Sequence, residues 1–285
     1  MTTTTGSSTA PVAVLGATGQ QGGAVVAALL ERGAPVRALV RDPAKASHLT
    51  DRGAQLSTVD LDDPASLRAA FDSAAAVFAM TTMTGPAGTD GEVAHGRAIA
   101  DAARATQVPH LVYSSVGGAE RHTGVPHFES KWAVEQYLRE LAVPTTVVRP
   151  TFFMENFLRG FPPSVQDGEL VLRAPLTPGV PLQMIATADI GRAAASVLLD
   201  PDAVPGSAVE IAGDERTGEE VADAFGRHRE LPARFEPLPL DALNDPDAEA
   251  MFAWLSQPPA YLADFDTTRT LVGQLTDFPA FVAQQ

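Results

Sequence analysis

Hydrophobic positions in the first half of the chain fall into short apolar runs separated by amphipathic stretches. The short runs predict buried strands, whereas apolar residues spaced by three and four predict helices that cover a sheet. Strands and helices alternate with short links, which predicts a parallel sheet with helices on both faces. We expect strands at residues 12–15, 36–40, 55–59, 75–80, 110–115 and 145–148, and helices at 24–30, from 64 onward, at 92–105 and at 125–141.

The pattern changes after Pro150, where aromatic residues and prolines become frequent. Two further strands are expected at residues 182–185 and 209–212, with a helix at 189–199 between them. Thr217 and Glu220 have the spacing of a capping box, which predicts another helix. The topology of about the last 55 residues is not predicted by the pattern.

The composition restricts the classes of function. The chain has 285 residues, 45% of them hydrophobic, so it is long enough to bury a large core. A net charge of −15 argues against binding to the nucleic-acid backbone or to anionic membranes. The chain has no cysteine, and its histidines show no metal-ligand spacing, so no metal is expected. No apolar run approaches about 20 residues, so we expect a cytoplasmic protein without a membrane span.

The first predicted strand runs directly into a glycine-rich turn, Gly16-Ala17-Thr18-Gly19-Gln20-Gln21-Gly22-Gly23, and then into a helix. This context is typical of dinucleotide binding, because the backbone of the turn and the helix N-terminus can approach a pyrophosphate. Gly16 would allow the tight turn, Gly19 the approach of the phosphates, and Gly22 or Gly23 close packing of the helix on the strand. The alternative is a tight turn without a ligand. The residues expected to bind the cofactor here are Gly16, Thr18, Gly19, Gln20, Gln21 and Gly22.

Together these features predict a Rossmann-like, doubly wound α/β fold with a smaller mixed lobe that binds the substrate. The expected organisation is a disordered tail over residues 1–10, an NAD(P)-binding domain over 11–150 and the smaller lobe over 151–285. About residues 182–212 of that lobe are expected to return to the main sheet.

A basic residue follows the second predicted strand, at the position that faces the adenosine ribose in dinucleotide folds. Arg41 there favours NADP(H) over NAD(H), since a guanidinium can pair with the 2′-phosphate. Arg37 and Lys45 are placed to add positive charge, whereas Asp42 could instead serve a ribose hydroxyl. The alternative is an arginine that is simply solvated.

The loops after the third and fourth strands should reach the same cofactor, because ligands in such folds bind beyond the carboxyl ends of the strands. Asp60 or the backbone of Leu61 is placed to meet the adenine, although this stretch also contains a helix cap. Thr81 opens a loop rich in Gly, Thr and Pro over residues 81–91 and is expected to contact the cofactor.

The chain resembles the short-chain dehydrogenase/reductases, and specifically their atypical NmrA-like branch, over roughly residues 11 to 215. The resemblance rests on the glycine turn, on Arg41, on His127-Phe128-Glu129-Ser130-Lys131, and on Val148-Arg149-Pro150-Thr151-Phe152-Phe153-Met154-Glu155-Asn156-Phe157. In the wider superfamily a Tyr-x-x-x-Lys pair acts, with tyrosine as the proton donor and lysine on the nicotinamide ribose. This sequence has Lys131, but His127 stands where the tyrosine would be.

The resemblance therefore implies that Lys131 binds the ribose, whereas carbonyl reduction by the usual acid is not expected. His127 is a candidate proton donor, with a non-catalytic polar wall as the alternative. Ser114 and Ser115 end the fifth strand, where the superfamily places its substrate-orienting serine, and either could bond a substrate oxygen or the cofactor. The alternative is a simple strand-end hydroxyl. We retain Lys131, His127 and Ser115 as candidate catalytic residues.

An aromatic cluster follows the sixth strand, near the expected nicotinamide end. Phe152, Phe153 and Phe157 are candidate substrate-binding residues that could line a pocket for a flat apolar molecule such as a quinone or dye. The alternative is a hydrophobic core that joins the two lobes.

Two functions are consistent with these motifs. The first is an NAD(P)H-dependent reductase that transfers hydride to a small apolar, quinone-like or aromatic acceptor. The second is a non-catalytic NADP(H)-binding sensor that regulates through a protein partner, as the resemblance to the NmrA-like branch also implies.

Overall fold

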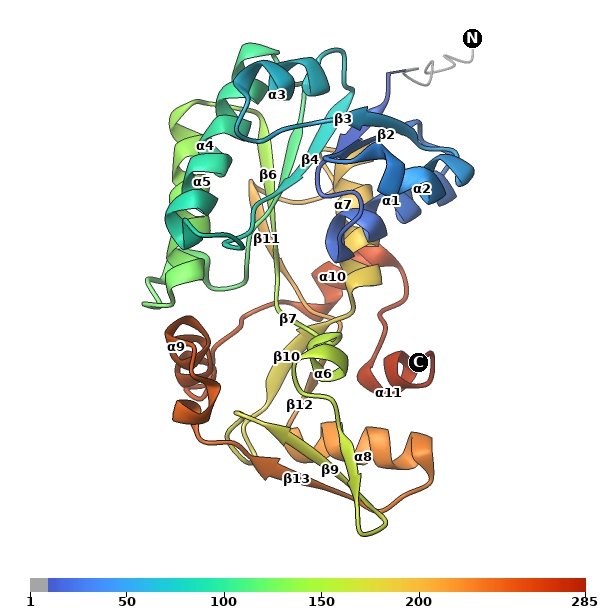
Figure 1. Ribbon diagram of the computed structural model, residues 1–285, viewed down its shortest axis with the longest axis vertical. Coiled ribbons are helices and arrows are strands. Elements are labelled where there is room, and N and C mark those ends of the chain that lie inside the picture. The colour runs from blue at the N-terminus through green and yellow to red at the C-terminus, as the bar shows by residue number, and fades with distance from the viewer. Residues whose placement is uncertain (1–9) are drawn as a thin grey trace.

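The computed structural model describes residues 10–285, so most of the expected N-terminal tail lies outside the described residues. A seven-stranded sheet, in which every neighbouring pair is parallel, forms the upper part of the molecule (Figure 1). Its order is β11-β6-β5-β4-β1-β2-β3. The strands are β1 (Val12–Val14), β2 (Val36–Val40), β3 (Gln55–Thr58), β4 (Ala76–Met80), β5 (Leu111–Ser114), β6 (Thr145–Pro150) and β11 (Ala208–Ile211).

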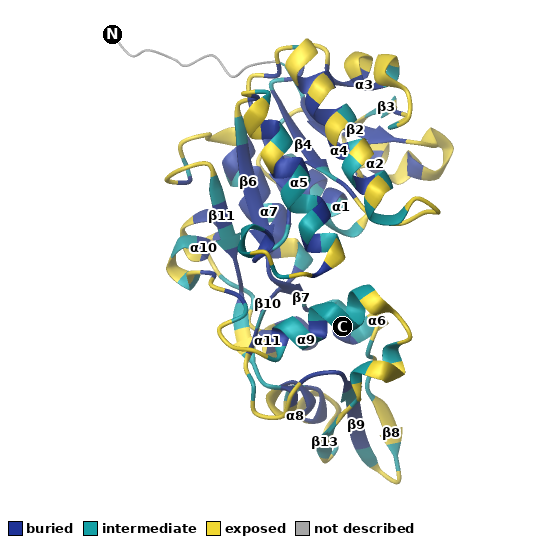
Figure 2. Cartoon of the chain, turned by 90° about the vertical axis from the view of Figure 1, so that its left-hand side faces the viewer, coloured by how far each residue is buried: buried dark blue, intermediate teal, exposed yellow. Residues whose placement is uncertain are grey.

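Helices cover both faces of this sheet, which is why its central strands are apolar on both sides and buried (Figure 2). One face packs on α1 (Gln20–Glu31), α2 (Ser47–Asp51), α7 (Thr187–Leu199) and α10 (Phe265–Val272). The other face packs on α3 (Pro64–Phe71), α4 (Gly88–Ala105) and α5 (Pro126–Glu140).

The order of the sheet reverses between β1 and β4, because the chain runs from β1 to β3 in one direction and from β4 to β11 in the other. In open α/β sheets, ligands bind beyond the carboxyl ends of the strands at such a reversal. The doubly wound fold predicted from the sequence is confirmed, and this edge of the sheet is where a site is expected.

A smaller part of the molecule lies below the carboxyl ends of the main sheet and holds an aromatic-rich core (Figure 1). Two three-stranded sheets build it, one ordered β12-β10-β7 and the other β13-β9-β8. Their strands are β7 (Phe152–Phe153), β8 (Ser164–Gln166), β9 (Glu169–Ala174), β10 (Leu182–Ile185), β12 (Asp214–Arg216) and β13 (Ala233–Pro237). The helices here are α6 (Asn156–Arg159), α8 (Gly218–Arg229), α9 (Pro246–Leu255) and α11 (Phe278–Val282), with the short 3₁₀ turn η3 (Leu240–Leu243). Two further 3₁₀ turns, η1 (Pro43–Ala46) and η2 (Ala119–Arg121), follow β2 and β5 of the main sheet.

Two expectations about the secondary structure were wrong. Strand β10 does not return to the main sheet, since it pairs with β7 and β12. An apolar run predicts a strand but not its partner, and the edge of β6 is already occupied by β11. Helix α4 begins at Gly88, inside the segment that was expected to be a loop.

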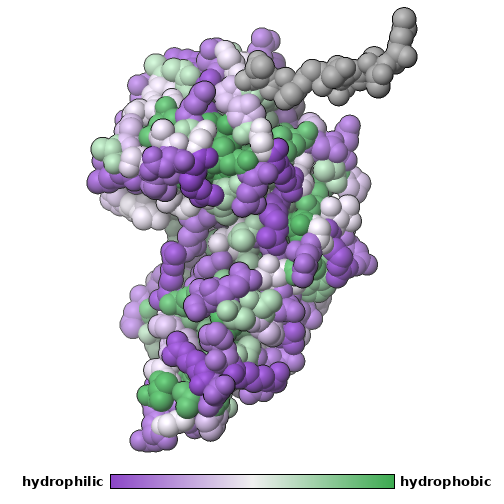
Figure 3. Space-filling model, turned by 90° about the vertical axis from the view of Figure 1, so that its right-hand side faces the viewer, coloured by the Kyte–Doolittle hydropathy of each residue, from purple (hydrophilic) through white to green (hydrophobic). Residues whose placement is uncertain are grey.

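Space-filling Figure 3 shows an indentation between the main-sheet part and the smaller part of the molecule. The carboxyl ends of the main strands face the smaller part, because the chain passes directly from β6 into β7 there. Among residues 10–285, no helix is long and apolar enough to cross a membrane.

Candidate functional site

The glycine turn between β1 and α1 has the backbone that its spacing predicts. Gly16 has a φ of +66°, a conformation that favours glycine. A Cβ at Gly22 would lie 2.2 Å from the carbonyl oxygen of Gly16, so only glycine allows α1 to sit this close to the turn. The nearest atom to a Cβ at Gly23 is 3.4 Å away. Of the two glycines that the sequence offered for close packing, Gly22 is the one that the geometry requires.

The N-terminus of α1 is open to an anion. Gly19 is the N-cap, makes no side-chain capping bond, and is exposed together with Gly16 and Thr18. No acidic side chain lies in the first turn. The first N–H groups of a helix carry partial positive charge, so this end is complementary to a phosphate.

The end of β2 presents one basic side chain to solvent. Arg41 is exposed, and no carboxylate within residues 10–285 pairs with it. Asp42 accepts a hydrogen bond from the backbone of Ala44 and caps η1, which gives it a structural role. Lys45 lies 3.7 Å from Asp42 and is well exposed. Arg37 was expected to add positive charge here, but it donates to carbonyl oxygens at the end of α3, so its guanidinium is committed to the fold.

The loop after β3 is stabilised by its own side chains. The Asp60 carboxylate accepts a hydrogen bond from the backbone N–H of Asp62, and the backbone N–H of Asp60 donates to Ser66. Asp60 is exposed and Leu61 is half-buried, so this loop contributes one polar and one apolar group to the carboxyl edge.

Lys131 belongs to a buried polar network between α5, α4 and the end of β4. Its Nζ lies 2.8 Å from Oε1 of Glu92 and 3.0 Å from the carbonyl oxygen of Thr81. Ser130 donates to Oε2 of Glu92 at 2.5 Å, and the Thr81 hydroxyl donates to Oε1 at 3.1 Å. Because the single hydrogen of the Thr81 hydroxyl is used in the bond to Glu92, the hydroxyl of Tyr113 is the donor in its 2.9 Å hydrogen bond with Thr81 Oγ1. The network therefore connects Lys131 to a carboxylate that is 1% exposed.

Tyr113 does not replace the missing catalytic tyrosine. It is wholly buried in β5, and burial raises the pKa of its hydroxyl. A raised pKa makes the phenol a weaker proton donor at neutral pH. Tyr261 is also buried, and burial followed by the charge of Glu210 raises its pKa.

Two serines end β5 beside the glycine turn. Ser114 donates a hydrogen bond of 2.6 Å to the side-chain oxygen of Gln21, which ties β5 to α1 across β4. Ser115 Oγ is buried and has no hydrogen-bond partner among the described residues. Buried hydroxyls usually find a partner, so this unpaired hydroxyl is a candidate contact for a bound substrate or cofactor.

His127 is fixed by the smaller part of the molecule. Its Nδ1 lies 2.6 Å from one carboxylate oxygen of Asp247 in α9, and its backbone N–H donates to the other oxygen. Burial acts to raise the pKa of Asp247, but the hydrogen bonds and charge of His127 outweigh burial and lower it. The pairing gives His127 a structural function in joining α5 to α9.

The aromatic cluster after β6 forms the core of the smaller part. Phe157 is wholly buried, with its ring 5.4 Å from Phe152 and 5.5 Å from Phe278. Phe152 is 4% exposed, and only Phe153 is half-buried. Phe152 and Phe157 were expected to line a substrate pocket, and in this structure they pack in the core instead, because the rings of Phe252 and Phe278 cover them.

Two site residues were missed in the sequence. The sequence pattern predicts Glu92 only as the start of a helix, yet Glu92, Gly96, Ile99 and Ala103 share the buried face of α4. A lone carboxylate on an apolar helix face is a signal that a buried partner exists. Asp247 could not be found this way, because its contact with His127 joins residues 120 positions apart.

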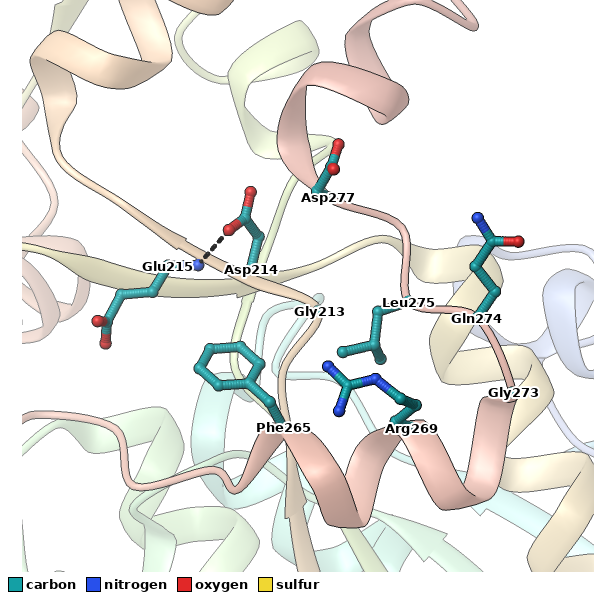
Figure 4. Close-up of a pocket in the computed structure, with 9 residues that line it drawn as sticks. All are labelled: Gly213, Asp214, Glu215, Phe265, Arg269, Gly273, Gln274, Leu275 and Asp277. Atoms are coloured by element: carbon teal, nitrogen blue, oxygen red, sulfur yellow. Dashed lines mark hydrogen bonds between the residues drawn. The ribbon is translucent and has the colours of Figure 1, made fainter.

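A hollow with a volume of about 680 Å³ lies away from the glycine turn, between α10, α11 and the start of β12 (Figure 4). Its charged groups stabilise the local backbone: Asp214 accepts from Arg216 and from the N–H of Phe278, and Arg269 pairs with Asp266. None of its residues belongs to the loops after β1 to β5. The lining residues are Gly213, Asp214, Glu215, Phe265, Arg269, Gly273, Gln274, Leu275 and Asp277.

Asp189 connects helix α7 of the main-sheet part to the segment between α10 and α11. The carboxylate lies in the first turn of α7, is wholly buried, and accepts hydrogen bonds from the N–H and hydroxyl of Thr276 and from Arg192. Burial raises its pKa, against the opposing effect of these donors. Its role is therefore structural.

The residues present are compatible with a dinucleotide. An uncapped helix N-terminus, a turn that only glycine can form, an exposed arginine after β2, and a lysine and an unpartnered serine hydroxyl at the ends of β4 and β5 lie along one edge of the sheet. Within residues 10–285 no group of three acidic or histidine side chains is placed to hold a metal ion.

Comparison with known proteins places this geometry in a family. Residues 8–257 match the model of the NmrA-like family. The chain is 31% identical to the NAD(P)H azoreductase of Xenophilus azovorans over 92% of this chain and 93% of that protein. It is 30% identical to the nitrogen metabolite repression protein nmrA of Emericella nidulans over 76% of this chain and 64% of that protein. Its fold matches the triphenylmethane reductase of Citrobacter sp. complexed with NADP(H), with a TM-score of 0.78, 24% identity, and coverage of 96% and 99% of the two chains.

Proposed function

The chain belongs to the NmrA-like family, and on that premise we propose that it is an NAD(P)H-dependent reductase of small apolar, quinone-like or aromatic acceptors. The observation that carries the proposal is the joint presence, at one edge of the sheet, of a phosphate-binding type of turn and of Lys131 held beside the end of β4. The similarity to an NAD(P)H azoreductase over nearly the full length of both chains supports the same function.

The proposed cofactor is NADP(H) in preference to NAD(H). Arg41 supports this preference, because its guanidinium is exposed and uncommitted at the position that faces the adenosine ribose. Asp42 is committed to capping η1 and is therefore a poor ligand for a ribose hydroxyl. The proposed phosphate ligands are the backbone groups of Gly19, Gln20 and Gly22, with Gln21 tied to Ser114 beside them. Thr18, Lys45, Asp60, Leu61 and Thr81 complete the proposed cofactor site.

The nicotinamide, when bound, supplies hydride to the acceptor. The chain positions the reactants: Lys131 has one ammonium N–H left beyond its bonds to Glu92 and Thr81, and we assign it to the nicotinamide ribose. Ser115 has a buried free hydroxyl that can orient an acceptor oxygen or nitrogen. His127 is held by Asp247 and is proposed as a wall of the site.

The absence of a catalytic tyrosine favours acceptors that need little proton donation. A quinone that accepts hydride becomes a hydroquinone monoanion, which water can protonate afterwards. The alkoxide formed from an unactivated ketone is a far stronger base, and without a proton donor its formation would be slower by about 10²–10⁴-fold. Quinones and conjugated dyes are therefore the proposed class, and Phe153 is the one ring of the cluster with surface to offer them.

The test is steady-state oxidation of NADPH against a panel of quinones, azo dyes, triarylmethane dyes and simple ketones. We expect turnover with the conjugated acceptors and little with the ketones. The matched control is Gly19→Val, whose side chain would block the phosphates. A Cβ there would lie 3.2 Å from the backbone oxygen of Gly16, so circular dichroism first checks that the variant is folded. A cofactor-sensing regulator, which the similarity to the nitrogen metabolite repression protein also supports, would instead bind NADPH tightly without turning over any acceptor.

A further inference from the structure

The proposed function assigns no separate role to the buried carboxylate of Glu92. The residue is 1% exposed and lies on α4, whereas its partners Ser130 and Lys131 lie on α5 and Thr81 follows β4. A buried carboxylate is costly unless it is paired and hydrogen-bonded, and Glu92 is both.

The packing of α4 on α5 brings this carboxylate to the lysine. Gly96 is one turn after Glu92, and a Cβ there would lie 2.2 Å from Cγ2 of Val134. The missing side chain lets the two helices approach closely enough for Glu92 to reach Lys131 at 2.8 Å. The contact is thus fixed by backbone packing and does not depend on a flexible surface side chain.

The composition of the chain adds an independent argument. Lys45 and Lys131 are its only lysines, and the other 18 of its 20 basic residues are arginine. The Lys131 position suits a compact ammonium, because three N–H donors diverge from one nitrogen, toward Glu92, toward the carbonyl oxygen of Thr81 and toward the remaining free side. A planar guanidinium has a different donor geometry and cannot substitute for it without rearrangement.

We propose that Glu92 is a positioning residue: its carboxylate orients the Lys131 ammonium so that the third N–H points toward the nicotinamide ribose and can donate a hydrogen bond to it. This inference rests on the proposed function of Lys131. Glu92 accepts two hydrogen bonds from Thr81 and Ser130 in addition to the ammonium, so its own rotamer is fixed as well. The carboxylate acts through Lys131 and does not touch the reactants.

The first measurement needs no cofactor. In protein labelled with ¹⁵N at the lysine side chains, an ammonium whose protons exchange slowly gives a resolved signal, and Lys45→Arg leaves Lys131 as the single lysine. We expect a sharp Lys131 signal that broadens away in Glu92→Gln, which keeps the size and the bond to Ser130 but removes the charge. An unchanged Lys131 signal in Glu92→Gln would overturn the proposal.

The second measurement is a double-mutant cycle on the dissociation constant of NADPH. We expect Lys131→Met to weaken binding about tenfold or more, the scale of a charge-assisted hydrogen bond. Glu92→Gln should weaken binding several-fold alone and add nothing in the Lys131→Met background, and Glu92→Asp should restore part of the loss. An equal effect of Glu92→Gln in both backgrounds would show a general structural role and overturn the proposal.

The two measurements fail separately. Unchanged NADPH affinity in Lys131→Met would refute the ribose contact and with it the role of Glu92 toward the cofactor, whatever the NMR signal shows. If Glu92→Gln does not fold, Glu92→Met, which also removes the charge, is measured in its place, and a Lys131 signal as sharp as in the parent protein would overturn the proposal.

Discussion

Replacing each of two adjacent glycines in α1, Gly22 and Gly23, by alanine should change the free energy of unfolding in opposite directions. A Cβ at Gly22 would lie 2.2 Å from the carbonyl oxygen and 2.5 Å from the carbonyl carbon of Gly16, and 2.8 Å from the oxygen of Leu15. All three atoms belong to the backbone of β1 and its turn, so they cannot rotate away. At Gly23 the nearest atom is the oxygen of Ala17 at 3.4 Å, which is an ordinary contact.

The magnitudes follow from these contacts. Replacing a helical glycine by alanine gains up to about 1 kcal/mol of helix propensity. Forcing one extra methyl into a packed site costs about 1–3 kcal/mol, and more when backbone must move. We therefore expect Gly22→Ala to lower the free energy of unfolding by about 2 kcal/mol, and Gly23→Ala to raise it by up to about 1 kcal/mol.

Urea denaturation followed by tryptophan fluorescence measures both changes, with a constant m-value as the condition for comparing midpoints. NADPH affinity is measured on the same samples, because opening the turn should also weaken binding in Gly22→Ala and leave it unchanged in Gly23→Ala. Equal stability of the two variants would refute the close approach of α1 to the turn, and with it the geometry assigned to the phosphate site.

Three further predictions concern the cofactor, pH and the histidine of α5. Arg41→Ala should weaken NADPH binding by roughly 1.5–3 kcal/mol and leave NADH nearly unchanged; calorimetry with both cofactors checks this, and equal NADH and NADPH affinities in the parent protein would contradict it. Burial lowers the pKa of His110, whose Nε2 bonds Thr146 and whose Nδ1 is buried without a partner. The unfolded chain therefore binds a proton more readily than the folded one, so stability is lost as the pH falls below about 6.5, by up to about 1.4 kcal/mol per pH unit. Urea midpoints between pH 8 and 5 should fall less in His110→Gln, and parallel profiles would show that other groups dominate. His127→Phe should retain most quinone reduction, whereas efficient ketone reduction that collapses in this variant would identify His127 as a catalytic acid.

The doubly wound sheet was predictable because the spacing of apolar residues within each segment of the first half of the chain indicates whether that segment is a strand or a helix. Gly16 and Gly22 were predictable for a related reason, since their roles depend on neighbours six residues apart. Helix α4 was predicted four residues short, because Gly88 and Gly91 are typical of a loop, whereas in the structure the helix begins at Gly88.

Contacts between segments that are distant in the chain could not be predicted from the sequence. The pair of His127 and Asp247, and the choice of β7 and β12 as partners of β10, depend on how the smaller part folds back on the main sheet. The aromatic residues after β6 illustrate the same limit, since a cluster of phenylalanines is compatible with a pocket or a core until Phe278 supplies the other wall.

The most direct test of the reductase function is a single turnover without oxygen, in which protein saturated with NADPH is mixed with a quinone and the absorbance at 340 nm is followed. The reductase proposal predicts that the absorbance decays in step with loss of the quinone, and more slowly when the transferred hydrogen of NADPH is replaced by deuterium. Tight NADPH binding with no decay, for the quinone and for azo and triarylmethane dyes alike, would contradict it.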